Sequence, residues 1–167
     1  MFLLETSRLL LREITLEDAS FIFELVNTPN WLRFIGDRGI KTKEDAKAYI
    51  EESYLESYKT HGFGAYVMIQ KSEGVVIGSC GLYKRPNLDY PDIGFAMLPQ
   101  YGKMGYAFEA ASALMEYAKT TLNLNTILAI TLQENENSIA LLEKIGLREI
   151  DTVKISEDTE ELLLFST

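Results

Sequence analysis

A glycine-containing loop directly before a helical sequence is the first segment that could do chemistry. Residues 98–110 read LPQYGKMGYAFEA, in which two glycines flank a lysine and a methionine and an alanine-rich run follows. Glycines at such a junction let the backbone approach a ligand, and the free N–H groups of a first helical turn attract phosphate oxygens. The segment matches neither G-x-x-x-x-G-K-[ST] nor G-x-G-x-x-G. Spacing alone therefore leaves both a structural turn and a phosphate site open.

A second polar segment follows a run that is typical of a buried strand. Residues 135–147 read NENSIALLEKIGL and come after TILAITL, which is apolar on both faces. Because ligands of open α/β sheets usually sit at the carboxyl ends of strands, polar residues here lie where a ligand would bind. Asn135 and Ser138 are equally typical of helix caps, and that interpretation stays open.

The rest of the sequence predicts the elements that position these two segments. Capping patterns at Thr15 with Asp18 and at Thr42 with Asp45 predict helices that end near Asn27 and Lys59. Short Gly-, Asn- and Pro-containing turns between β-branched runs predict antiparallel strands. The predicted strands are residues 8–14, 64–70, 75–84, 92–98, 126–132, 147–156 and 161–167, and the later helices are 106–122 and 138–146. Residues 31–39 show no readable pattern.

This order predicts an α/β (α+β layered) fold with a mixed central sheet of about six to seven strands flanked by about four helices. The sequence contains no proline-rich linker and no internal repeat, so we expect a single domain over residues 1–167.

Composition and charge exclude several classes of partner. Of the 167 residues, 47% are hydrophobic and 25% are charged, and the net charge is −9. A negative protein repels nucleic acid and anionic membranes, whereas it attracts a cationic amine. Cys80 is the only cysteine, which suits a reducing compartment, and we find neither a signal peptide nor an apolar run long enough to span a membrane. We expect a cytoplasmic protein.

Both segments resemble motifs of one enzyme superfamily. DIGFAMLPQYGKMGYAFEA followed by NENSIALLEKIGL is similar to the central and second motifs of the GNAT superfamily of acyl-CoA N-acetyltransferases. RLLLRE near the start and EKIGL resemble its branch of ribosomal-protein N-terminal (alanine/serine) acetyltransferases. The resemblance implies a GNAT-like domain that uses acetyl-CoA as cosubstrate and no metal.

The resemblance also implies where the cofactor binds. The family loop reads Gln/Arg-x-x-Gly-x-Gly/Ala, and its first position falls on Gln100, its middle glycine on Lys103 and its last on Gly105. Either the turn is shifted here or this position tolerates a side chain. The implied pyrophosphate contacts are the amides of Met104, Gly105, Tyr106 and Ala107, with Lys103 as an added cation or a solvated side chain. The implied contacts with the pantetheine arm are Ala96, Met97, Leu98 and Asn135.

Acetyl transfer to an amine needs a proton acceptor, a stabilised oxyanion and a proton for the leaving thiolate. Asp92 stands where similar family members carry a glutamate base, although an exposed structural carboxylate is an equal alternative and Glu13 is a reserve candidate. A strand amide near Met97 is the implied oxyanion donor. The family's tyrosine acid falls on Leu142, so Ser138 becomes the candidate proton donor, with a helix cap as its alternative. The resemblance implies direct attack in a ternary complex.

Other reactive or aromatic residues have weaker cases. Cys80 lies in an apolar run, where a buried and inert thiol is usual. His61 cannot form a metal site with one lone cysteine, and a Ser-His-Asp triad has little support. Either a substrate entrance or a core position suits the early aromatic residues, which are Trp31, Phe34, Tyr49, Tyr54 and Tyr58.

Two functions are compatible with this sequence. The first is acetyl transfer from acetyl-CoA to a primary amine, which is a protein N-terminus or a small cationic amine. The alternative is a catalytically silent module that binds or senses acyl-CoA. The acceptor has no readable motif, and the sequence is compatible with a monomer or a homodimer.

Overall fold

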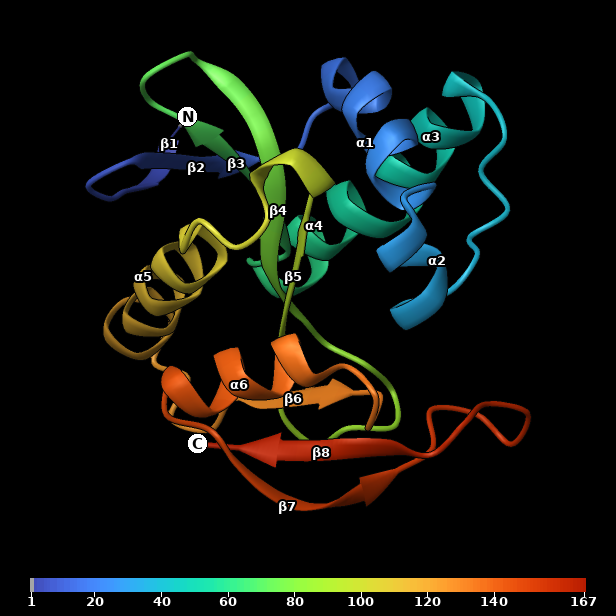
Figure 1. Ribbon diagram of the computed structural model, residues 1–167, viewed down its shortest axis with the longest axis vertical. Coiled ribbons are helices and arrows are strands. Elements are labelled where there is room, and N and C mark those ends of the chain that lie inside the picture. Colours follow the sequence, from blue (N-terminus) through green and yellow to red (C-terminus); the bar gives the residue numbers. More distant parts are fainter. Residues whose placement is uncertain (1) are drawn as a thin grey trace.

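An eight-stranded mixed sheet with helices on both faces organises the computed structural model, which describes residues 2–167 (Figure 1). The strands are β1 (Phe2–Glu5), β2 (Leu9–Glu13), β3 (Ala65–Gln70), β4 (Val75–Tyr83), β5 (Asp92–Met97), β6 (Leu128–Thr131), β7 (Arg148–Val153) and β8 (Leu162–Ser166). Their order in the sheet is β1-β2-β3-β4-β5-β6-β8-β7. The α/β prediction is confirmed, and β1 is the strand beyond the predicted number.

The helices are η1 (Leu16–Asp18), α1 (Ala19–Val26), α2 (Pro29–Phe34), α3 (Lys43–Tyr49), η2 (Ile50–Leu55), α4 (Glu56–His61), η3 (Pro99–Tyr101), α5 (Tyr106–Thr120) and α6 (Glu136–Lys144). At the start of α3, the Thr42 hydroxyl accepts from the Asp45 N–H at 3.0 Å, and the Asp45 carboxylate accepts from the Thr42 N–H at 2.8 Å. The predicted capping box is therefore confirmed. No helix in the described part of the chain is long and apolar enough to cross a bilayer.

Helix α2 was not predicted, although its start signal is present. Thr28 is its N-cap and accepts from the Trp31 N–H at 3.4 Å, while Pro29 occupies the first helical position. These residues follow directly on the end of α1, so the same polar cluster ends one helix and starts the next.

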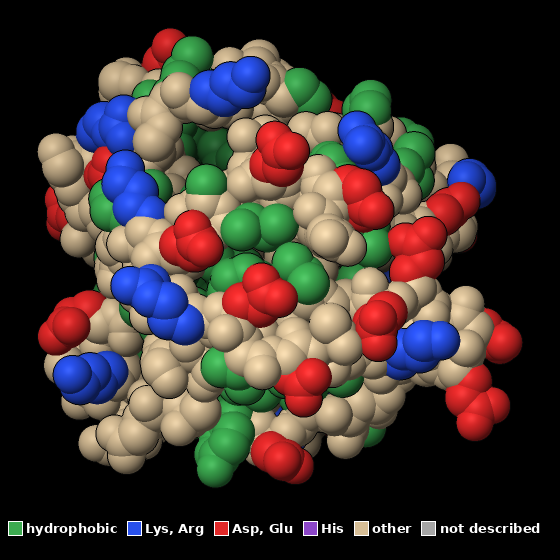
Figure 2. All heavy atoms as spheres, turned by 60° about the horizontal axis from the view of Figure 1, so that its bottom comes forward, with side chains coloured by type: hydrophobic (Ala, Val, Ile, Leu, Met, Phe, Trp, Pro, Cys, Tyr) green, Lys and Arg blue, Asp and Glu red, His purple; other side chains and the backbone are tan. Residues whose placement is uncertain are grey.

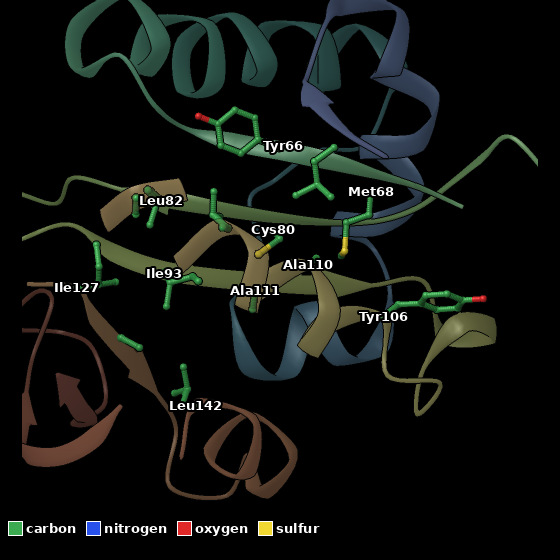
Figure 3. Close-up of a cluster of buried hydrophobic side chains, with 14 of the residues drawn as sticks. Tyr66, Met68, Cys80, Leu82, Ile93, Tyr106, Ala110, Ala111, Ile127 and Leu142 are labelled. Carbon is green, nitrogen blue, oxygen red and sulfur yellow. The ribbon is translucent and has the colours of Figure 1, made fainter. Parts of the chain in front are cut away.

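Hydrophobic side chains fill both sides of the sheet. One cluster joins β3, β4 and β5 to α5 and α6, and Figure 3 shows Cys80 and Ile93 of the strands near Ala110 and Ala111 of α5. The second cluster packs α1 to η2 against the opposite face, with Val67 of β3 and Leu98 after β5. The small side chains of α5 allow its backbone to lie close to the sheet.

The sheet opens between its two parallel strands. β5 pairs with β4 over its whole length, from Tyr83↔Asp92 to Gly78↔Met97, but it pairs with β6 only at Asp92↔Leu128. Figure 1 shows β5 and β6 running in diverging directions from that point. The divergence leaves one backbone edge of β5 without a neighbouring strand.

Leu114 of α5 is the clearest place to test the core. Its side chain is 0% exposed, so Leu114→Ala should lower the free energy of unfolding by about 2–5 kcal/mol through lost burial and a residual cavity. Urea unfolding measures this change. Leu32→Ala is the matched control, because Leu32 is a helical leucine that is 41% exposed. Equal losses in the two variants would contradict the assignment of α5 to the core.

Candidate active site

A cavity of about 1110 Å³ lies where β5 and β6 separate, and it extends to α2 and η2. The reserve candidate Glu13 does not line it, but all except one of the other residues predicted for the site do, namely Asp92, Ala96, Met97, Leu98, Lys103, Gly105, Tyr106, Ala107, Asn135 and Ser138. Met104 is the exception: its side chain is 53% exposed, and its carbonyl accepts from Arg8 Nη1 at 2.9 Å. The structure thus brings the two polar segments of the sequence to one cavity.

The free edge of β5 exposes only alternate backbone groups to this cavity. The Leu98 N–H donates to the Ile77 carbonyl of β4 at 2.9 Å, whereas the Pro91 carbonyl accepts from Leu128 of β6 at 2.8 Å. Because backbone groups alternate in direction along a strand, those of Ile93, Phe95 and Met97 point to the side from which β6 departs. Among the three predicted arm contacts of this segment, Ala96, Met97 and Leu98, Met97 is therefore the one whose amide faces the cavity.

The start of α5 presents N–H groups that no side chain caps. Gly105 is the N-cap, with a left-handed φ of 81°, and no side chain accepts a hydrogen bond from the first turn. The first-turn N–H groups also have no acceptor inside the helix, and the positive end of the helix dipole lies behind them. This helix start can hold an anion such as a phosphate.

Lys103 adopts a left-handed backbone conformation, which glycine adopts more readily than other residues. Its φ is 61°, whereas Gly102 is extended with φ −66° and ψ 154°. Of the two alternatives for this position, a turn that tolerates a side chain is the one the structure has. The left-handed region costs an ordinary residue roughly 1–2 kcal/mol, so the loop carries some strain at this position.

Arg8 holds the loop from the other side. Its Nε donates to Glu109 Oε2 of α5 at 2.7 Å, and its guanidinium carbon lies 4.3 Å from the centre of the Tyr106 ring. Glu109 Oε1 also accepts from the Arg8 N–H at 2.7 Å and from the Thr6 hydroxyl at 2.6 Å. These contacts lower the pKa of Glu109 against the opposing effect of burial, which is the largest influence on it. The β1–β2 turn thereby fixes the first turn of α5.

Substitutions at Lys103 separate backbone strain from charge. Lys103→Gly should raise the free energy of unfolding by about 0.5–1 kcal/mol, because relief of strain exceeds the extra entropy of an unfolded glycine. Lys103→Gln keeps the strain and should leave stability unchanged. Both variants lose the cation, so each should weaken acetyl-CoA binding by about twofold to fivefold in calorimetry. Unchanged binding in both would assign Lys103 to solvent.

Asp92 is buried at the far end of β5 from this loop. Its side chain is 1% exposed, and its Oδ1 accepts from Arg85 Nε at 2.9 Å. Burial raises the pKa of Asp92 above its ordinary value, because the attraction of Arg85 only partly offsets the loss of solvation. The alternative of an exposed carboxylate is therefore wrong.

Tyr83 lies beside this carboxylate. It is the direct partner of Asp92 in the β4–β5 register, so the two side chains share the sheet face that carries α1 to η2. Gly94 makes room for its ring, since a Cβ there would lie 3.0 Å from Tyr83 Cε2. Burial raises the pKa of the Tyr83 phenol, which stays neutral. Sequence reasoning missed both Tyr83 and Arg85.

At the start of α6, Asn135 and Ser138 have different hydrogen-bonding roles. Asn135 is the N-cap, and its Oδ1 accepts from the Ser138 N–H at 3.3 Å. The Ser138 hydroxyl has no hydrogen-bond partner in the described chain, so the cap function belongs to Asn135 and the hydroxyl of Ser138 is free. Leu142 is 1% exposed and belongs to the core.

The remaining candidate residues differ in burial and in whether they line the cavity. Trp31, Phe34, Tyr49 and Tyr54 line the cavity, whereas Tyr58 does not, and its hydroxyl donates to the Ala65 carbonyl. Cys80 is 0% exposed, and burial raises the pKa of its thiol to about 12, which confirms an inert cysteine. His61 is exposed and stacks on Phe63.

Comparison with known proteins decides the family. Residues 8–148 match the acetyltransferase (GNAT) domain family. The chain belongs to the GNAT acetyltransferase family. It is 34% identical over 143 residues to the uncharacterized N-acetyltransferase YnaD of Bacillus subtilis (strain 168), covering 86% of this chain and 81% of that protein.

Solved structures share the GNAT fold. The ribosomal-protein-S5-alanine acetyltransferase from Vibrio fischeri has a TM-score of 0.80 at 19% identity, covering 98% of this chain and 94% of that chain. Spermidine N-acetyltransferase from Vibrio cholerae, in complex with CoA and spermine, has a TM-score of 0.78 at 20% identity, covering 97% and 96%. These likenesses confirm the fold expected of a GNAT acetyltransferase.

Proposed function

We propose that this GNAT acetyltransferase transfers an acetyl group from acetyl-CoA to a primary amine by direct attack in a ternary complex. The observation that carries the proposal is the single cavity that joins an uncapped helix start, a free strand edge and a buried carboxylate. These three features lie on α5, on β5 and at Asp92. Each corresponds to one requirement of the reaction.

The chain's own groups fit the cofactor. The amides of Gly105, Tyr106 and Ala107 would hold its pyrophosphate, because no acceptor within residues 2–167 takes their hydrogen bonds. The free backbone groups of Phe95 and Met97 would pair with the amides of its pantetheine arm as an added strand does. The Asn135 side-chain amide would meet the same arm from α6. When bound, acetyl-CoA supplies an acetyl group activated as a thioester.

Asp92 is the proposed proton acceptor for the amine. An amine must lose its proton to become nucleophilic, and a lysine-like amine with a pKa near ~10.4 is almost wholly charged at neutral pH. The raised pKa of Asp92 makes its carboxylate a better proton acceptor than an exposed aspartate. Arg85 orients the carboxylate through Oδ1 and leaves Oδ2 without a hydrogen-bond partner in the described residues.

Two further groups complete the chemistry. The Met97 N–H, fixed by the strand, would donate a hydrogen bond to the oxygen on which negative charge develops. The free Ser138 hydroxyl would donate to the departing thiolate. Met97 and Ser138 both line the cavity, and neither group has a hydrogen-bond partner within residues 2–167.

Two measurements test cofactor binding and the direct mechanism. Calorimetry with acetyl-CoA should show one site per chain. The intact mass of the protein after incubation with acetyl-CoA alone should stay unchanged, because no acyl-enzyme forms and Cys80 is buried. Absence of binding at millimolar acetyl-CoA would refute the cofactor assignment, and a stable acetyl adduct would refute direct attack.

A further inference from the structure

The cavity has a second end, on the side away from α5, whose charge differs from that of the protein. This end is formed by α2, the residues after it, η2 and Tyr83, on the sheet face opposite α5. Figure 1 likewise shows α2 and α5 on opposite sides of β5. The phosphate-binding features described above belong to the α5 side, so this end is where the acceptor would enter.

Basic residues outnumber acidic ones in the cavity lining, although the protein as a whole carries a charge of −9. The acidic side chains elsewhere are spread over the surface, as Figure 2 shows for one face. The five basic lining residues are Arg33, Arg38, Arg85, Lys103 and Lys144, and the three acidic ones are Asp92, Glu134 and Glu136. The cavity thus favours an anionic group that the surface would repel.

Arg33 and Arg38 are the two cations at this end that no carboxylate neutralises. Both are exposed, and neither forms an ion pair or a side-chain hydrogen bond with any residue in the range 2–167. Arg85, in contrast, is committed to Asp92 at 2.9 Å. The Arg33 guanidinium lies 4.6 Å from the centre of the Phe34 ring, which limits the directions in which it can point.

An arginine fork matches a carboxylate or a phosphate in shape and charge. Aromatic side chains stand beside it, since Trp31, Phe34 and Tyr49 line the same end. A polyamine would place several positive charges against Arg33 and Arg38, which is unfavourable. A primary amine with an apolar body and one anionic group is complementary to this end of the cavity. The aromatic side chains would contact its apolar body, and the arginines would bind its anionic group.

We infer that the acceptor of this acetyltransferase is a primary amine that also carries an anionic group, which Arg33 and Arg38 bind at the α2 end of the cavity. This inference rests on the proposed function, because it assigns the substrate class of the same site. It replaces the cationic acceptor that net charge alone suggested.

Matched acceptors test the inference. 4-(Aminomethyl)benzoate and 4-(aminomethyl)benzamide have nearly the same shape but differ in charge, and 4-(aminomethyl)phenylphosphonate distinguishes a phosphate-like anion from a carboxylate. At least one of the two anionic amines should have a kcat/KM roughly tenfold or more above that of the benzamide. Spermidine should be a poorer acceptor than either. A benzamide or spermidine that equals or exceeds both anionic amines would overturn the inference while leaving acetyl transfer established.

Substitutions of Arg33 and Arg38 test whether these two residues bind the anionic group. Arg33→Gln and Arg38→Gln should raise KM for the preferred anionic amine roughly tenfold and leave KM for the benzamide and Kd for acetyl-CoA unchanged. Lys47→Gln is the control, since Lys47 is an exposed cation of α3 outside this cavity. A preference for the anion that survives both arginine variants would refute the assignment to α2. Weakened acetyl-CoA binding would instead assign the two arginines to the cofactor.

Direct binding separates this inference from the reaction itself. Calorimetry of the protein saturated with CoA should detect binding of the anionic amine, and Arg33→Gln should raise its Kd roughly tenfold. Binding without turnover would refute the proposed function and retain the anion site. Turnover of neutral amines without binding of the anionic ones would refute the anion site and retain the proposed function.

Discussion

Replacing Asp92 with asparagine is expected to lower kcat for amine acetylation by roughly 10²- to 10⁴-fold while leaving Kd for acetyl-CoA unchanged. Asparagine keeps the shape of the side chain and can still face Arg85, but it cannot accept a proton. Steady-state kinetics and calorimetry on the same preparation measure the two quantities. Asp89→Asn is the matched control, because Asp89 is an exposed carboxylate in the loop that precedes β5 and does not line the cavity.

The buried position of Asp92 also predicts a pH dependence. Its pKa is raised above 3.8, so kcat/KM should fall in acid with a midpoint above the ordinary aspartate value, as the carboxylate becomes protonated. Asp92→Asn should remove that limb from the residual activity. Full activity of Asp92→Asn, or an acid limb that persists in it, would remove Asp92 from the mechanism.

The stability of the protein tests the raised pKa of Asp92 independently of its activity. A raised folded-state pKa means that the protein favours protonated Asp92, so its contribution to stability is present below the unfolded pKa and is lost as the pH rises through the folded pKa. At neutral pH the ionised carboxylate is therefore a cost to the fold. Asp92→Asn should have a Tm at pH 7 equal to or above that of the parent protein, which excludes unfolding as the cause of lost activity.

Gly105→Val is expected to weaken acetyl-CoA binding at least tenfold. A β-branched residue is a strong outlier at φ 81°, and its Cβ would lie 3.3 Å from Arg8 Nη2, so the first turn of α5 must move away from its present position. Thermal unfolding should show a loss of about 1–2 kcal/mol, and calorimetry should show the loss of affinity.

Gly74→Val is the control for this variant. Gly74 has a comparable φ of 69°, and a Cβ there would meet nothing within 4 Å. It lies in the β3–β4 turn, outside the cavity. The control should lose similar stability while binding acetyl-CoA as the parent does. Equal affinities in the two variants would contradict the phosphate site at α5.

Local signals in the sequence predicted most elements of this fold. The capping box at Thr42 depends on residues three positions apart, and the apolar stripe of α5 depends on helical spacing, so both are visible without tertiary contacts. Helix α2 was missed because the polar residues that start it also end α1, and strand β1 was missed because four residues are too few to show a clear alternation. The π-helical stretch η2 has no comparable local signal.

Only those site residues that belong to a recognisable sequence motif were predicted. Asp92, Gly105 and Asn135 were placed by their motifs, and all three line the cavity. Arg85 and Tyr83 were missed because their contacts depend on the register between β4 and β5, which sequence pattern does not fix to one residue. Arg33 and Arg38 were missed because only packing brings α2 and the residues after it to the cavity.

Release of CoA thiol across a panel of primary amines, with the acetylated product identified by mass, tests the proposed reaction most directly. The panel includes peptide N-termini and the matched aromatic amines described above. We predict thiol release that depends on an amine and equals the acetyl amide formed. Acetyl-CoA that binds but yields no amine-dependent thiol would contradict the account and leave a silent acyl-CoA-binding protein.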